Sequence, residues 1–270
     1  THLDTMSTRF TTIGTTISRN VNPAFNMMVR GLAVVTGAMG VLTGVSLRIG
    51  GDFQQAMTTV GTISQATEEQ LASLTETARR MGRDLPRTAQ DAAQAMTYLA
   101  QKGWDISRIQ DTVADVMNLS ISQAYGLAES ADLLSGVMSA YKMEASQAAE
   151  LTDILNNAAN QSALTMEKLS YAFRYAAPVA SAFGVSVKQL SSHFAVLANQ
   201  NLDGSTIGAG WRMVAQRIQQ AGADGGMAFR RLGVEVKNAD GSMRDMTSIL
   251  EDLGGFLEKN EDPHVAIARE

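Results

Sequence analysis

The residues that could perform chemistry in this chain are few and lie far apart in the sequence. The histidines are His2, His193 and His264, and their separations do not fit the ligand spacing of a zinc site. The chain has no cysteine, which excludes disulfides and thiolate metal sites. It also contains no HExxH, GxSxG or phosphate-loop pattern. We therefore predict that the chain is not an enzyme and binds no metal or cofactor.

Two Asp-Gly-Ser segments are similar to fragments of a calcium-binding loop. They are Asp203-Gly204-Ser205 and Asp240-Gly241-Ser242, and each lacks the alternating oxygen ligands and the closing glutamate. We interpret both as turns. The net charge of −5 predicts no basic face of the kind that sequence-specific nucleic-acid binding requires.

The composition favours a mainly helical fold. Only 6% of the residues are aromatic and only 4 are proline, whereas alanine, methionine, leucine and glutamine are abundant. Small side chains allow neighbouring helices to approach closely. The large side chains that we expect to anchor this packing are Phe53, Tyr98, Trp104, Tyr175 and Trp211.

A charge-free, glycine-rich segment covers residues 31–47. Its length is at the lower limit for crossing a bilayer core of roughly 30 Å. Gly40 and Gly44 have the GxxxG spacing that permits close helix contact. We predict an apolar helix over residues 24–50 that packs against protein, with membrane insertion as the alternative. The residues expected at an oligomer or membrane contact are Met27, Met28, Gly37, Met39, Gly40 and Gly44.

Helix-start signals recur at a regular interval after this segment. The spacing of a capping box, strict or loose, is found at Thr67, Thr88, Ser107 and Ser186. Further candidate caps are Gly126, Ser146, Thr165 and Ser205. Consecutive candidates are about 20 residues apart, so two helices form a unit within the size range of helical-hairpin repeats. The sequence predicts about eight short helices, in an array that is either a compact bundle or an open solenoid.

The helical pattern is interrupted over residues 232–246. Val234 and Val236 alternate with charged residues before an Asp-Gly turn, which predicts a small β-hairpin, and a helix follows near Ser248. The predicted organisation is a linker or frayed helix (1–23), the apolar helix (24–50), a helical core (51–231), and the hairpin with a C-terminal helix (232–270).

Five segments, in this order, resemble the core region of the phage tail tape measure (minor tail) protein family. They are GGDFQQAMTTVGTISQATEEQL (50–71), TAQDAAQAMTYLAQKGWD (88–105), LLSGVMSAYKMEASQAAELTDILNNAANQS (133–162), YAAPVASAFGVSVKQL (175–190) and LGVEVKNADGSMRDMTSILEDL (232–253). The resemblance covers residues 24–258, and its specificity comes from the order and spacing of the segments. Two departures are Asn199-Gln200-Asn201-Leu202, where the family more often has Ala-Gly, and Trp211, where a smaller residue is common.

This resemblance implies a structural protein of a tailed bacteriophage or prophage, located in the tail tube lumen or tail tip and assembled in the host cytoplasm. Such a protein sets tail length, takes part in tail assembly and helps the genome enter the host. The implied partners are a few copies of itself, tail tube and tail tip or baseplate proteins, tail assembly chaperones, and the host membrane during infection.

Two other classes of function remain as alternatives. A stand-alone membrane-active or pore-forming protein would use residues 31–47 as its spanning helix. A cell-wall hydrolase would need a paired acid and base for glycan cleavage, and the sequence shows no such pair.

Overall fold

The computed structural model describes residues 51–223 and 227–259. The chain divides into two compact units, Thr1–Gln55 and Ala56–Glu270, and the described helices from α4 onward belong to the second. The predicted apolar helix over residues 24–50, with its proposed contact residues from Met27 to Gly44, lies outside the described residues.

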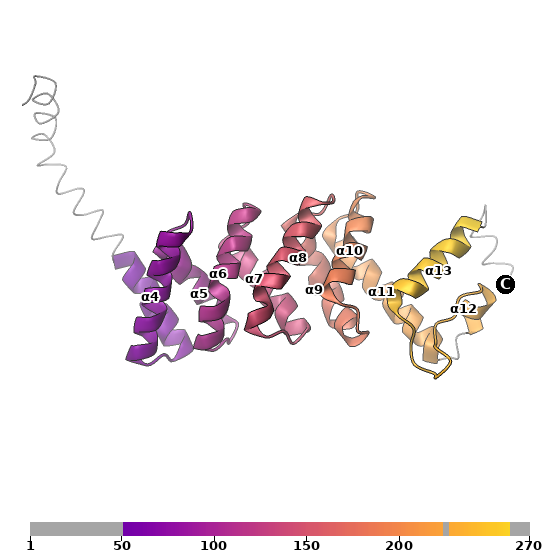
Figure 1. Ribbon diagram of the computed structural model, residues 1–270, viewed down its shortest axis with the longest axis horizontal. Helices are drawn as coiled ribbons and strands as arrows, with labels where there is room; N and C mark the ends of the chain where they lie inside the picture. The colour runs from indigo at the N-terminus through magenta and orange to yellow at the C-terminus, as the bar shows by residue number, and fades with distance from the viewer. Residues whose placement is uncertain (1–50, 224–226, 260–270) are drawn as a thin grey trace, which may run out of the picture. The chain divides into compact units, whose positions relative to one another are not determined.

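The described residues are mainly helical, as the composition predicts (Figure 1). Residues 51–64 are helical and lead into the helices that fill the second unit. Those helices are α4 (Glu68–Asp84), α5 (Ala89–Gln101), α6 (Ile106–Ser122), α7 (Leu127–Ala140), the 3-10 turn η1 (Ala145–Gln147), α8 (Ala148–Asn160), α9 (Met166–Ala182), α10 (Val187–Ala198), α11 (Gly204–Ala223), α12 (Met227–Arg231) and α13 (Met246–Lys259).

Helices α4, α5, α7, α9 and α10 start at predicted caps. Thr67, Thr88, Thr165 and Ser186 each accept a hydrogen bond from a backbone N–H in the first turn, and Gly126 occupies the cap position of α7. These side chains satisfy amide donors that have no partner inside the helix.

Three other helices do not begin at the predicted cap residue. Asp105, not Ser107, caps α6, and Asp203, not Ser205, caps α11 through a 2.9 Å hydrogen bond from the Thr206 amide. In both cases an aspartate lies two residues before the serine, and a carboxylate also interacts favourably with the positive end of the helix dipole. Helix α8 follows η1, so its start is not at Ser146.

The same turn closes helix after helix. At Gly103, Ala124, Lys142 and Gly184 the backbone has positive φ, and the amide of the next residue bonds to the carbonyl five positions before it. This is the hydrogen-bond pattern of a Schellman motif, which ends a helix and reverses the chain. A repeated turn of one geometry gives consecutive helices a repeated relation to each other.

Among the helices α4 to α11, each one packs against the next helix and against the next but one of this set. The even-numbered helices α4, α6, α8 and α10 thus form one layer, and the odd-numbered helices α5, α7, α9 and α11 form the other. Within this part of the chain, substantial contacts join only helices at most two positions apart. The arrangement is a helical-hairpin array in which each buried face depends on sequence neighbours.

The closest helix approach in the array is between α9 and α11. Gly204 and Gly208 of α11 are buried and face the backbone of α9 at Lys168 and Ala172. A Cβ atom added at Gly208 would lie 2.7 Å from the Cα of Ala172, which is closer than two carbons can pack. The Gly-x-x-x-Gly spacing of α11 therefore sets the distance between these two helices.

The β-hairpin predicted over residues 232–246 is not supported. One antiparallel bridge joins Lys237 and Met243 around a turn, and no strand occurs in the described part of the chain. The segment that follows the turn is short because Asp245 already caps α13, where its carboxylate accepts a hydrogen bond from the Ser248 amide at 3.1 Å. Val234 and Val236 are buried, so their alternation reflects packing rather than strand pairing.

Gly208→Ala is expected to destabilise the protein, whereas Gly210→Ala in the same helix is expected to stabilise it. The first adds a methyl group against the α9 backbone, an overpacking that costs about 1–3 kcal/mol. The second meets no atom within 4 Å and gains roughly 0.5–1 kcal/mol of helix propensity. Urea unfolding followed by circular dichroism measures both, and equal effects of the two substitutions would show that α9 and α11 are not in close contact.

Candidate functional site

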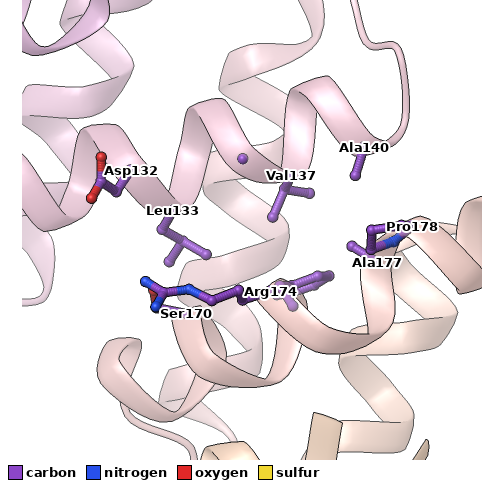
Figure 2. Close-up of a pocket in the computed structure, with 10 residues that line it drawn as sticks. Asp132, Leu133, Val137, Ala140, Ser170, Arg174, Ala177 and Pro178 are labelled. Atoms are coloured by element: carbon purple, nitrogen blue, oxygen red, sulfur yellow. The ribbon is translucent and has the colours of Figure 1, made fainter. Parts of the chain in front are cut away.

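A groove lies between α7 and α9, and we call it the α7–α9 groove. One end of it is a hollow of about 210 Å³. Figure 2 shows Leu133 and Val137 of α7 on one side and Arg174, Ala177 and Pro178 of α9 on the other. This end is mostly apolar, and Asp132, Gly136, Ala140, Ser170 and Phe173 complete its lining.

Two residues that line the hollow are unusual for a helix interior. Gly136 is exposed on α7, and a Cβ atom added there would meet nothing within 4 Å. Alanine would favour the helix by about 1 kcal/mol over this glycine, so packing does not explain it. Pro178 lies inside α9 and has no N–H, so the carbonyl of Arg174 lacks its usual helical donor.

The other end of the groove is acidic. This hollow of about 420 Å³ shares Asp132, Ser170 and Arg174 with the apolar end. Its remaining lining residues are Tyr125, Gly126, Glu129, Glu167 and Tyr171. Asp132 pairs with Lys102 at 2.6 Å, and the guanidinium of Arg174 lies 5.4 Å from the centre of the Tyr171 ring.

The carboxylates at this end act on a neighbouring tyrosine. Burial raises the pKa of Tyr125, and the charges of Glu129 and Glu167 raise it further, while a hydrogen bond with Ser170 opposes them. The raised pKa keeps the Tyr125 phenol protonated, and therefore uncharged, near neutral pH.

A separate hollow, of about 400 Å³, lies between α8 and α10 in the layer of even-numbered helices. Its lining includes Lys188, Asn157, Gln161 and Ser191 but no carboxylate. The Ser191 hydroxyl is buried and has no hydrogen-bond partner in the described structure. The two layers therefore present grooves of different charge.

His193 lies at a junction of three elements rather than in a metal site. The Trp211 indole N–H of α11 donates to His193 Nδ1 at 3.2 Å, and the Thr247 hydroxyl of α13 lies 3.3 Å from Nε2. An indole N–H can only donate, so Nδ1 is unprotonated and the neutral ring carries its proton on Nε2. The histidine side chain of α10 thus links α11 to the C-terminal helix. No local pattern in the sequence indicates this junction, because its members are separated by up to 54 positions.

The residues expected to anchor the packing differ in exposure. Trp104 and Trp211 are buried and Tyr98 is half-buried, whereas Phe53 is half-buried in the first unit. Tyr175 is the most exposed of the five, at 38%. The guanidiniums of Arg108 and Arg212 lie over two of these rings, at 4.1 Å from the centre of Trp104 and 5.9 Å from that of Tyr175.

Both Asp-Gly-Ser segments act as local turns or caps. Asp203 accepts hydrogen bonds from Ser205 and Thr206, and these bonds lower its pKa to about 2. Asp240 accepts from the amide and hydroxyl of Ser242. Within the described ranges, no three potential ligand side chains come together to hold a metal ion. No described helix combines the length and apolarity that crossing a bilayer requires.

Acidification is expected to weaken the His193 junction. Burial lowers the pKa of His193 below its ordinary value near 6.5, and the carboxylate of Asp245 opposes this shift more weakly. As the pH falls below 6.5, the unfolded chain therefore binds a proton that the folded chain still excludes. The contribution of His193 to the free energy of unfolding is therefore fully present above pH 6.5 and decreases below it.

Urea unfolding at about pH 7.5 and about pH 5.5 tests this expectation, with His193→Gln as the matched variant. Glutamine keeps an acceptor for Trp211 but does not titrate. The loss of unfolding free energy on acidification should be smaller in the variant. The same loss in both proteins would contradict a neutral, proton-excluding His193.

Comparison with known proteins adds an independent line of evidence. The chain is 33% identical over 101 residues to the probable tape measure protein of Escherichia phage P2. This aligned region is 37% of this chain and 12% of that protein. It is 28% identical over 237 residues to the tape measure protein of Pneumococcus phage Dp-1. That aligned region is 86% of this chain and 20% of the phage protein. The chain thus spans a fifth or less of these relatives. No solved structure matches it.

The family model for phage-related minor tail proteins matches residues 75–268. The match starts within α4 and includes every later helix of the array, together with the α7–α9 groove and the His193 junction. Four of the five ordered segments lie within this match, and the chain belongs to the phage-related minor tail protein family.

Proposed function

We propose that this chain is a structural, non-enzymatic region of a tail tape measure protein, which takes part in tail length determination, tail assembly and genome delivery into the host. The observation that carries the proposal is the family match over most of the helical array. The relatives named above are themselves called tape measure proteins, one of them probable.

The chemistry of the described polar residues supports a structural role. Capping carboxylates and hydroxyls, such as those of Asp91 and Ser186, bind backbone amides. Asp203, the residue with the most strongly lowered carboxyl pKa, is held ionised as a helix cap and so is no proton donor near neutral pH. These side chains stabilise helix ends through hydrogen bonds to backbone amides, which is a structural role.

The array itself is poorly suited to set tail length, because each of its residues adds little to its length. A straight helix rises 1.5 Å per residue, whereas neighbouring helices pack about 8–10 Å apart. A pair of helices with about 40 residues thus advances the array by roughly 10 Å, or about 0.25 Å per residue. We infer that longer helical parts of the tape measure protein set most of the tail length and that this region serves as an attachment or assembly element.

The proposed location is the tail tube lumen or tail tip of the virion, with the host cytoplasm as the place of assembly. The proposed partners are further copies of the chain, tail tube and tail tip or baseplate proteins, and tail assembly chaperones. Contact of residues 31–47 with the host membrane during infection belongs to the same proposal. Its support is the family relationship and the charge-free composition of that segment.

Deletions in a phage that carries this chain test the ruler and the attachment roles separately. Removing residues from a long helical stretch elsewhere in the tape measure protein should shorten the tail by about 1.5 Å per residue. Removing a helical pair within residues 88–222 should instead block tail assembly, since it removes buried faces on which neighbouring helices pack. Electron microscopy of the particles measures both outcomes.

The two arms of this experiment have distinct meanings. Tails of unchanged length in the first arm would contradict the ruler assignment. Normal virions in the second arm would contradict the attachment role of the array. Gly210→Ala serves as the matched control, because it leaves the array intact and should give normal tails.

A further inference from the structure

We propose that the α7–α9 groove binds a polypeptide segment that carries a lysine or arginine at one end and aliphatic side chains two to three helical turns away. The inference rests on the groove itself and does not depend on the proposed function.

Gly136 is the first reason to regard the groove as a binding surface. Gly136 lines the hollow, and a Cβ atom added there would meet no atom within 4 Å. An alanine would make α7 more stable, yet it would also begin to fill the groove. The physical role that remains for this glycine is to keep the hollow open between Leu133 and Pro178.

Several of the polar groups that line the groove are hydrogen-bond acceptors. Glu129, Asp132 and Glu167 provide carboxylates, and the carbonyl of Arg174 lacks its helical donor because of Pro178. The cations of Arg174 and Lys102 leave one negative charge uncompensated among these three carboxylates. A lysine or arginine brings both positive charge and several N–H donors, so it complements this end of the groove.

The apolar end has the complementary preference for aliphatic side chains. Leu133, Val137, Ala177 and Pro178 line it. Glu129 precedes Val137 by eight residues of α7, and Glu167 precedes Ala177 by ten residues of α9, which corresponds to about 12–15 Å along the helices. That separation corresponds to two to three turns of a helical segment or a few residues of an extended one. The occupant must therefore be longer than a single side chain.

The rim of the groove has the residue types that dominate protein interfaces. Tyr171 lines the acidic end and is 42% exposed, with the guanidinium of Arg174 over its ring. Tyrosine and arginine are enriched among the residues that contribute most to binding. The hollow between α8 and α10, with Lys188 and no carboxylate, lacks this complementarity to a cation.

Selection from an mRNA-displayed library of random twelve-residue peptides against the 270-residue chain tests the proposal. The enriched peptides should share a basic residue and aliphatic residues two to three turns apart. A synthetic peptide of the enriched sequence is then titrated against three variants by fluorescence anisotropy. Gly136→Leu places a side chain in the groove, and the double substitution Glu129→Gln and Glu167→Gln removes two of its three carboxylates. Gly210→Leu makes the same glycine-to-leucine substitution at an open site outside the groove.

The peptide should bind Gly136→Leu and the double variant at least tenfold more weakly than the unmodified chain, and it should bind Gly210→Leu equally well. Higher ionic strength should weaken binding to the unmodified chain more than to the double variant. The melting temperature of Gly136→Leu should be no lower than that of the unmodified chain, which separates a blocked groove from an unfolded protein. Enrichment of acidic peptides, no enrichment, or equal binding to Gly136→Leu would overturn the proposal.

Discussion

The structure depends on one constraint, which is that no helix of the array can bury its apolar face without its neighbours in sequence. Each helix has a stripe of buried residues, such as Leu74 and Ala78 in α4 or Leu190 and Phe194 in α10, and the covering surface comes from helices one or two positions away. The edge-to-face packing of Phe173 on Phe194, with ring centres 5.2 Å apart, is one such contact between α9 and α10. Stability is then approximately a sum of neighbour interfaces, and the local turns that repeat the helix geometry are as important as the buried side chains.

Glycine has opposite effects at two interfaces of the odd-numbered layer. At Gly208 the missing side chain lets α11 come into contact with the backbone of α9, and the interface closes. At Gly136 the missing side chain faces open space, and the neighbouring interface between α7 and α9 stays hollow. An array of similar helices can thus have both a tight junction and a groove, and a scaffold protein can present a binding surface without any catalytic group.

Local features of the sequence predicted much of the fold. The cap residues Thr67, Thr88 and Ser186 act within one turn of themselves, so their pattern identifies the helix start directly. Competing local signals caused the errors at α6 and α11, where an aspartate two residues upstream takes the cap. The groove and the His193 junction could not be predicted in this way, because they depend on which faces of different helices meet. Gly136 and Pro178 were visible in the sequence, but nothing in it shows that they lie across from each other.

Native-state hydrogen exchange along a guanidinium gradient tests the central claim of neighbour-dependent stability most directly. If the array is held by interfaces between consecutive helices, the amides of its terminal helices should open at lower free energy than those of α7 to α9, which have neighbours on both sides. Protection should therefore be lost in steps from the ends toward the middle. Exchange of all helices through a single global opening with one free energy would contradict this account and would instead indicate one central core.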